Sequence, residues 1–305
     1  MAEFSIIDTY FNRKSPHSVD LGVGDDSALL TPPPQQQLVI CADTLVAGRH
    51  FPLDTSPHAI GWKSVAVNLS DIAAMGAKPQ SILLALSLPQ IDHDWLKGFS
   101  QGLYDCCDQF GVSLIGGDTT QSPHLTISVT ALGWVDIGQA VTRSAAQVGD
   151  LICVSGTVGD AAFALQHLGH PLQHRLDYPT PRCELGQALK GLAHSMIDVS
   201  DGLAQDLSHI LKASHVGATL QLDQLPINTA LQDVTREQQW QYALAGGDDY
   251  ELCFTISPQN YEKLLQQQNH SSISVIGKID AESGLRFQQN GLDHSLQFNG
   301  YQHFA

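Results

Sequence analysis

The stretch Asn68-Leu69-Ser70-Asp71-Ile72-Ala73-Ala74-Met75-Gly76 carries a single acidic residue inside an apolar run. Apolar side chains recur here at helical spacing, at positions 65, 69, 72 and 75. This spacing predicts a helix that begins near Pro57, ends at Gly76 and buries one of its faces. A glycine at the end of such a pattern is typical of a helix C-terminus.

Asp71 lies within this apolar run, and the basic residues closest to it in the sequence are Lys63 and Lys78. An isolated carboxylate at the edge of a protein core is costly, so Asp71 needs a partner. Backbone amides or a distant arginine would be its partner in a structural role, and a cation would be its partner in a binding site. Asp71 alone does not decide between these roles, so the other acidic residues have to be considered with it.

Length and charge limit the class of protein. A chain of 305 residues suggests two domains of about 150 residues each, with ample core for both. Alternating strands and helices predict two α/β domains of the α+β type, and the pattern restarts near residues 148–150. We therefore place the domains at residues 1–148 and 149–305. The net charge of −16 argues against nucleic acid and anionic membrane as direct partners.

The six cysteines form no Cys-x-x-Cys pair, and Cys106 and Cys107 are adjacent. The first residues, Met-Ala-Glu-Phe-Ser, do not resemble a signal peptide. These features predict reduced thiols and a cytoplasmic location. The longest apolar run, from Ile82 to Leu86, is far too short to span a membrane.

Two predicted strands lead into polar residues. The segment 38–42 is typical of a buried strand, which would end at Asp43. The segment 112–115 is typical of a second strand, which would end before Gly116-Gly117-Asp118. Because α/β folds bind ligands at the carboxyl ends of their strands, we expect Asp43 and Asp118 at such ends.

Eight aspartates stand beside a glycine, at a predicted strand end or in an apolar run. They are Asp25, Asp26, Asp43, Asp71, Asp118, Asp198, Asp201 and Asp248. Each one alone is more often a structural turn residue, but the set is hard to explain by turns. Clustered carboxylates repel one another unless cations neutralise them. Oxygen ligands that leave room for water favour Mg²⁺, and the histidines show no zinc-binding pattern.

A nucleotide substrate would have to be bound without the usual phosphate cradle. The sequence contains no G-x-x-x-x-G-K-[ST] motif and only eight lysines. An acidic site would instead hold phosphates through several Mg²⁺ ions. Backbone amides of the glycine-rich turns and of the helix start at Ser200-Asp201-Gly202 would add to this binding.

Seven motifs follow one another along the chain in a specific order. They are Gly22-x-Gly-Asp-Asp26, Asp43-Thr-Leu-Val-Ala-Gly-x-His50, Asn68-Leu-Ser-Asp-x-Ala-Ala-Met-Gly76, Gly116-Gly-Asp-Thr-Thr120, Thr142-Arg-Ser144, Asp198-x-Ser-Asp-Gly202 and Gly246-Gly-Asp-Asp-Tyr-Glu-Leu252. In this order they resemble the bacterial thiamine-monophosphate kinases over essentially the full length of the chain. That family belongs with aminoimidazole ribonucleotide synthetase and selenophosphate synthetase.

The resemblance implies an activity and an architecture. The implied activity is the phosphorylation of thiamine monophosphate to thiamine diphosphate, with ATP as co-substrate and several Mg²⁺ ions. The implied fold has an N-terminal α/β domain that binds ATP and Mg²⁺, and a C-terminal α/β domain. Strands of the N-terminal domain would form a barrel across a homodimer, and neither nucleic acid nor membrane would be a partner.

The resemblance also assigns roles to individual residues. A cluster of Mg²⁺ ions would lie against Asp26, Cys41, Ala42, Asp43, Asp71, Asp118, Asp198 and Asp201. ATP would contact Gly117, Asp118, Arg143 and Ser200. Thiamine monophosphate would contact His50, Asp248 and Tyr301. The residues that would act in catalysis are Asp71, Asp118 and Arg143.

The sequence departs from the family pattern in two places. The family commonly has hydroxyl residues where this chain has Cys41-Ala42. This chain therefore has no hydroxyl side chain there to bind a metal ion. The family commonly has glutamate where Asp248 stands, so the reach toward the substrate is shorter by one methylene. Without the resemblance, Arg143 is typical of a surface ion pair, His50 of a loop histidine and Tyr301 of a packing residue.

The expected reaction is direct in-line transfer of the γ-phosphoryl group of ATP to the phosphate of thiamine monophosphate. The acceptor oxygen is already an anion, so bringing two polyanions together is the main difficulty, and cations reduce it. One alternative is another ATP-dependent synthetase of the same superfamily. A selenophosphate synthetase would carry a reactive cysteine near its N-terminus, whereas the first cysteine here is Cys41. The other alternative is a non-catalytic acidic Ca²⁺-binding module, although EF-hand spacing is absent.

Overall fold

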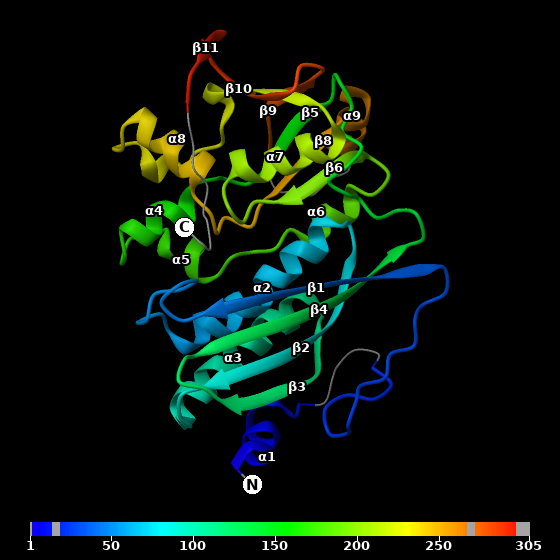
Figure 1. Ribbon diagram of the computed structural model, residues 1–305, viewed down its shortest axis with the longest axis vertical. Coiled ribbons are helices and arrows are strands. Elements are labelled where there is room, and N and C mark those ends of the chain that lie inside the picture. Colours follow the sequence, from blue (N-terminus) through cyan, green and yellow to red (C-terminus); the bar gives the residue numbers. More distant parts are fainter. Residues whose placement is uncertain (1, 14–18, 267–271, 297–305) are drawn as a thin grey trace. The chain divides into compact units, whose positions relative to one another are not determined.

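The computed structural model describes residues 2–13, 19–266 and 272–296 (Figure 1). The chain divides into two compact units, one from residues 1–72 with 77–138 and the other from residues 73–76 with 139–305. In the described part of the chain, none of the helices has the length and hydropathy that a membrane span requires.

The first unit is built on a four-stranded sheet with the strand order β1-β4-β2-β3. Its strands are β1 (Gln36–Val46), β2 (Lys78–Leu88), β3 (Ser113–Gln121) and β4 (Thr126–Asp136). Strand β4 pairs antiparallel with β1 and with β2, whereas β2 and β3 are parallel. Because β1 and β3 are its edges, the described residues form an open sheet and no closed barrel.

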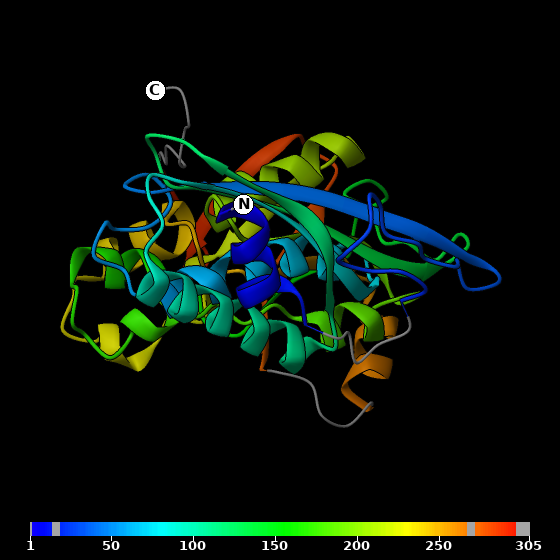
Figure 2. The same ribbon diagram turned by 90° about the horizontal axis from the view of Figure 1, so that it is seen from below.

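Two long helices, α2 (Pro57–Ala74) and α3 (His93–Phe110), cover one face of this sheet, as Figure 2 shows. The short helices α1 (Ala2–Ile6) and η1 (Ile7–Phe11) precede β1. The side chain of Asp92 caps α3 by accepting a hydrogen bond from the backbone N–H of Trp95 at 3.0 Å. Along β4, buried and half-buried residues alternate, so the face of the sheet away from the helices is only partly covered.

The second unit contains a seven-stranded, largely antiparallel sheet with the order β11-β10-β7-β9-β5-β8-β6. Its strands are β5 (Leu151–Ser155), β6 (Ala193–Asp198), β7 (Gly217–Gln221), β8 (Leu252–Ile256), β9 (Ile273–Asp280), β10 (Gly284–Gln289) and β11 (Leu292–His294). All five residues of the interior strand β8 are buried, as expected for a strand covered on both faces.

The helices of the second unit connect these strands. They are α4 (Asp160–Gln166), α5 (Gln173–Asp177), α6 (Cys183–Ala188), α7 (Leu203–Ser214), η2 (Leu222–Gln224), η3 (Thr229–Leu231), α8 (Arg236–Ala245) and α9 (Pro258–Gln266). The apolar face of α7, with Leu203, Leu207 and Ile210, packs in one core with Trp240 of α8. This core holds the loops at the ends of β6 and α8 in place.

Two predicted strands are longer in the structure than the sequence suggested. Strand β1 continues to Val46 and β3 continues to Gln121, so Asp43 and Asp118 lie inside strands. The prediction that they stand at strand ends was wrong, because neighbouring strands pair with both segments along their whole length. Gly117 permits this pairing, since a Cβ atom there would lie only 1.8 Å from the carbonyl oxygen of Leu84.

Candidate functional site

Asn68 ties helix α2 to strand β1 in the first unit. Its side chain is fully buried, and its Nδ2 donates to the carbonyl oxygen of Ser64 at 3.0 Å. Its Oδ1 accepts a hydrogen bond from the backbone N–H of Asp43 at 3.0 Å. Its own carbonyl oxygen accepts one from the thiol of Cys41 at 3.3 Å. These bonds fix Cys41 and Asp43 beside the helical turn that carries Asp71.

Cys41, Asp43 and Asp71 form one electrostatic group in the first unit. Burial raises the pKa of the Cys41 thiol, and the negative charges of Asp71 and Asp43 raise it further. The thiol is therefore protonated at neutral pH and is a weak metal ligand in that form. Asp43 and Asp71 are both half-buried, and Ala42 between Cys41 and Asp43 offers only its backbone atoms.

Asp118 lies on the other face of the same sheet. The register of β2 pairs Ala85 with Asp118 on β3 and with Ser128 on β4. Asp43 is paired with Val129, the next residue along β4. Because side chains alternate between the two faces of a sheet, the register separates Asp118 from Asp43. Asp118 is exposed.

Asp26 and His50 belong to the segments that flank β1. Asp26 is exposed, and its backbone N–H donates to Oδ1 of Asp25 at 2.8 Å. The ring of His50 closes the turn after β1, because its Nδ1 accepts a hydrogen bond from the backbone N–H of Val46 at 2.9 Å. This bond fixes the ring orientation and defines Nδ1 as the acceptor nitrogen.

Arg143 lies in the second unit and is exposed. Its carbonyl oxygen accepts a hydrogen bond from the hydroxyl of Ser214 at 3.2 Å. The hydroxyl of Thr142 donates to the carbonyl oxygen of Ser144 at 3.0 Å. The backbone around the guanidinium is therefore held in a defined turn. Tyr301, the other predicted contact near the C-terminus, lies outside the described residues.

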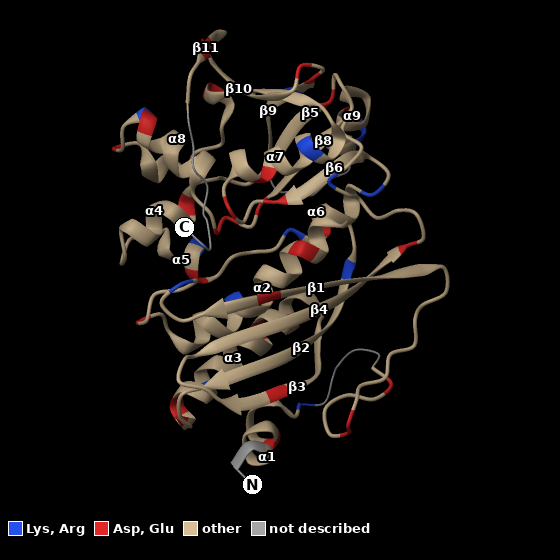
Figure 3. Ribbon diagram, in the orientation of Figure 1, with Lys and Arg blue, Asp and Glu red and all other residues tan. Residues whose placement is uncertain are grey.

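Asp206 organises the loop between β6 and α7. Its Oδ2 accepts hydrogen bonds from the backbone N–H groups of Ser200 and Asp201, both at 3.0 Å. The carboxyl group is almost completely buried, and burial raises its pKa to about 7, with further contributions from the charges of Asp198 and Asp201. Figure 3 shows the acidic residues gathered at this loop. Asp206 was not among the predicted site residues.

The predicted metal ligands fit Mg²⁺ by their chemistry. In each unit the structure places acidic oxygen donors close together, and their mutual repulsion is the condition that a hard cation relieves. Within residues 2–13, 19–266 and 272–296, no three His, Cys, Asp or Glu side chains form a preformed metal cage. Mg²⁺ is commonly bound through one or two carboxylates, with water and substrate phosphate oxygens completing its shell.

The segment 246–251 of the second unit contains the predicted acceptor contact Asp248. Its backbone pairs with the β6–α7 loop, because Asp248 N–H donates to the carbonyl oxygen of Ser200 at 2.9 Å and Tyr250 N–H donates to that of Val199 at 2.8 Å. Gly247 permits this approach, since a Cβ there would lie 2.3 Å from the carbonyl oxygen of Ser200. The predicted ATP contact and the predicted acceptor contact are thus hydrogen-bonded neighbours.

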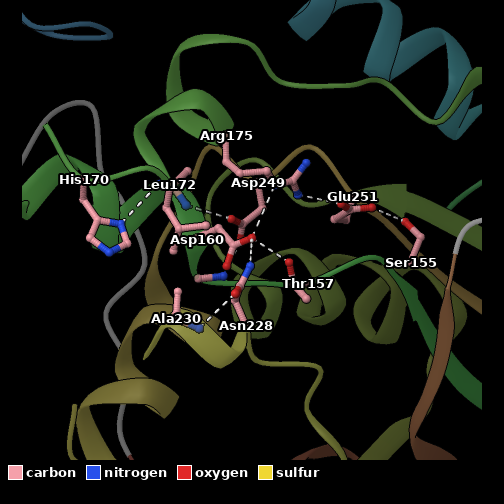
Figure 4. A network of polar contacts seen from close by, with 12 residues as sticks. Ser155, Thr157, Asp160, His170, Leu172, Arg175, Asn228, Ala230, Asp249 and Glu251 are labelled. Atoms are coloured by element: carbon pink, nitrogen blue, oxygen red, sulfur yellow. Dashed lines mark hydrogen bonds and ion pairs between the residues drawn. The ribbon is translucent and has the colours of Figure 1, made fainter. Parts of the chain in front are cut away.

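Two buried carboxylates anchor the same segment (Figure 4). Asp249 accepts hydrogen bonds from the backbone N–H groups of Gly159 at 2.6 Å and Ala161 at 3.2 Å. Burial raises the pKa of the Asp249 carboxyl, and the charge of Asp160 raises it further. Asp249 thereby ties the 246–251 segment to the start of α4, within the second unit.

Glu251 is the centre of a buried ion-pair group. Its side chain has no exposed surface, and it accepts hydrogen bonds from Arg175 Nη2 at 2.7 Å and Arg182 Nε at 2.6 Å. The hydroxyl of Ser155 donates to its Oε2 at 2.5 Å. Arg175 also contacts Oδ2 of Asp160 at 3.3 Å. Two arginines therefore hold the end of the 246–251 segment at the start of β8.

Two family models cover most of the chain. The N-terminal domain of AIR synthase related proteins matches residues 24–135, and the C-terminal domain of these proteins matches residues 147–290. A thiamine-monophosphate kinase from Escherichia coli strain K12 is 46% identical over 320 aligned residues, which cover 99% of this chain and 98% of the relative.

Solved structures agree with these matches. The crystal structure of a thiamine-monophosphate kinase from Stenotrophomonas maltophilia K279a has a TM-score of 0.84 at 45% identity, covering 94% of this chain and 95% of its own. A structure of AaThiL in complex with AMPPCP and TMP has a TM-score of 0.77 at 28% identity, covering 90% of this chain and 89% of its own.

Proposed function

The chain belongs to the thiamine-monophosphate kinase family of AIR synthase related proteins, and on that premise we propose how its own residues carry out the reaction. It phosphorylates thiamine monophosphate with ATP as co-substrate. The observation that carries this conclusion is the identity of 46% along almost the whole of both chains. Neither a synthetase of another branch nor a Ca²⁺-binding module is needed to account for the sequence.

The acidic residues of each unit supply ligands for Mg²⁺ in this proposal. In the first unit these are Asp43 and Asp71, with the backbone at Cys41 and Ala42, together with Asp26 and with Asp118, which lies on the other face of the sheet. In the second unit they are Asp198 and Asp201. The bound ions would neutralise phosphate charge and orient the phosphate oxygens. Two groups of charges in this structure support the proposal. Asp71 and Asp43 both act on the half-buried thiol of Cys41. Asp198 and Asp201 both act on the buried carboxyl group of Asp206.

The chemical step is a direct displacement. A phosphate oxygen of thiamine monophosphate forms a bond to the γ-phosphorus of ATP, the bond to the β,γ-bridging oxygen breaks, and ADP leaves with that electron pair. The attacking oxygen carries a charge and no proton, so the protein does not have to act as a strong base. Arg143 contributes a fixed positive charge to the transferring group. Gly117 and Ser200 would contact ATP, and His50, Asp248 and Tyr301 would contact the acceptor.

The proposed function is tested by incubating the purified protein with ATP and Mg²⁺ and a panel of acceptors. The panel includes thiamine, thiamine monophosphate, aminoimidazole ribonucleotide precursors and selenide. We expect thiamine diphosphate and ADP in equal amounts from thiamine monophosphate alone. Turnover of another acceptor with no thiamine diphosphate formed would overturn the proposal.

Substitution of the acceptor contacts should weaken binding of thiamine monophosphate more than binding of ATP. We expect Asp248→Ala and Tyr301→Ala each to raise the KM for thiamine monophosphate. The increase should correspond to roughly 1–2 kcal/mol of binding free energy, because each variant loses one desolvated contact. Asp248→Glu restores the residue that is common in the family and should be tolerated. Steady-state kinetics with each substrate varied in turn measures both effects. Equal changes in the two KM values would assign these residues a structural role instead.

We propose in addition that the partly covered face of the four-stranded sheet joins a second copy of this chain to form a barrel. On this face Leu38 is 44% exposed and Ile40 is 59% exposed. The register pairs them with Trp134 and Leu132 on β4, which are half-buried. These four apolar side chains form a patch on a sheet with open edges, and such a patch is typical of an interface between subunits.

Ile40→Asp should convert this dimer into a monomer, because the carboxylate would be desolvated in the interface without a partner. Ile91→Asp is the matched control, since Ile91 is 48% exposed on a loop away from this face. Sedimentation velocity of the wild type and both variants decides the matter. A dimer that persists in Ile40→Asp, or that is lost equally in the control, would place the interface elsewhere.

The cysteines support a reducing compartment for this reaction. All six are free thiols in the structure, and five of them are buried. Buried thiols that are not paired are typical of cytoplasmic proteins. We therefore keep the cytoplasm as the proposed location.

A further inference from the structure

The turn that carries Asp248 has an unusual backbone. Asp248 has a φ angle of +70° and Tyr250 one of +51°, both in the left-handed region. Residues with a Cβ atom adopt this region at a cost in free energy, and two of them within three positions are rare. Such a conformation persists only where the surrounding structure over-determines it, and it is concentrated at functional sites.

The surrounding structure does fix this turn on both sides. The backbone N–H groups of Asp248 and Tyr250 are bonded to the β6–α7 loop, and the buried side chains of Asp249 and Glu251 are bonded in the opposite direction, toward α4 and the two arginines. Val199 N–H also donates to the carbonyl oxygen of Glu251 at 2.8 Å. The turn is therefore anchored through the backbone of Asp248 and Tyr250 and through the side chains of Asp249 and Glu251. Asp248 itself remains half-buried.

One direct consequence of the two left-handed residues is a contact between their side chains. The hydroxyl of Tyr250 donates a hydrogen bond to Oδ1 of Asp248 at 3.0 Å, although only one residue separates them. The twisted turn thus brings the hydroxyl back onto the carboxylate, and Tyr250 itself is only 8% exposed.

We propose that Tyr250 is a positioning residue for the acceptor substrate: its hydroxyl holds the carboxylate of Asp248 in the orientation that receives the cationic or N–H-bearing part of thiamine monophosphate. This inference rests on the proposed function, in which Asp248 contacts the acceptor. A carboxylate whose rotation is restrained by a buried donor binds its ligand with less loss of conformational freedom. Tyr250 acts through Asp248 and has no contact with the reacting phosphates in this proposal.

The test removes only the hydroxyl, in the full-length protein. Tyr250→Phe should raise the KM for thiamine monophosphate about tenfold, the effect of losing a hydrogen bond to a charged group. The kcat and the KM for ATP should stay within about twofold of the wild type. The matched control is Tyr242→Phe in the same unit, which removes the buried hydroxyl that donates to Oε1 of Gln166 at 2.9 Å. Tyr242→Phe should leave both KM values unchanged.

A double-mutant cycle separates positioning from packing. In the Asp248→Ala background, Tyr250→Phe should change the KM for thiamine monophosphate by less than about twofold, because the carboxylate that it positions is gone. A KM that rises by the same factor in both backgrounds, or in neither, would overturn the inference. Failure of the proposed function has a different signature, since the wild type would then form no thiamine diphosphate at all.

Discussion

Asp71→Asn is expected to abolish phosphoryl transfer while the protein stays folded. The substitution keeps the shape of the side chain and removes its charge from the group formed with Asp43 and Cys41. Loss of one preorganised electrostatic contact at a reacting phosphate costs roughly 10²–10³-fold in kcat, and a shared metal ligand should cost at least that much. Because the substitution also relieves repulsion from Asp43, the free energy of unfolding should not fall.

Asp105→Asn is the control for this experiment. Asp105 is another helical acid of the first unit, and it pairs with Nε2 of His58 at 2.9 Å on the surface. Turnover and thermal unfolding should be measured for both variants. Full activity of Asp71→Asn would contradict a role in catalysis, and inactivity that is accompanied by unfolding would assign Asp71 a structural role.

Glu251→Gln is expected to cause the largest loss of stability in the second unit. The substitution leaves Arg175 and Arg182 without the charge that they share, and both guanidinium groups are about four-fifths buried. Removing one partner of a buried ion pair lowers the free energy of unfolding by about 3–5 kcal/mol. The same change should loosen the turn at Asp248, which lies three residues before Glu251.

Asp280→Asn is the matched control for Glu251→Gln. Asp280 pairs with Arg286 at 2.8 Å in the same unit, but each side chain is about one-third exposed. Its loss should lower the free energy of unfolding by only about 0–1 kcal/mol, because an exposed pair is screened by water. Urea unfolding followed by circular dichroism compares the two variants. Equal losses would mean that the Glu251 pair is not a buried anchor.

Local signals predicted helix α2 of the first unit well. The helix expected from Pro57 to Gly76 is observed at Pro57–Ala74. A proline near the start and a glycine after the end are signals that act within a few residues. The strand ends at Asp43 and Gly116 were misplaced, because pairing with a distant strand carried β1 and β3 through polar and glycine residues.

Composition and spacing singled out the acidic residues of the candidate site, but they did not indicate which residues support them. Asn68 is a fully buried amide in an apolar helix, and Asp206 is an acid in the first turn of α7. A polar residue at each of these two positions is visible in the sequence. Their hydrogen-bond partners are set by tertiary packing: Asn68 binds the backbone of Asp43, and Asp206 binds the backbone of Ser200. The ion pairs of Glu251 span 69 and 76 residues of sequence, and no local pattern indicates them.

The most direct test of the account is the location of the metal ions. Crystals of the protein grown with Mn²⁺ in place of Mg²⁺, a non-hydrolysable ATP analogue and thiamine monophosphate would be measured at the manganese absorption edge. We predict an anomalous peak about 2.0–2.2 Å from a carboxylate oxygen of Asp71, which is the distance of a metal ligand. The same ion should also contact phosphate oxygens of the nucleotide. Anomalous peaks on the phosphates that have no carboxylate of Asp71 or Asp43 among their ligands would contradict it.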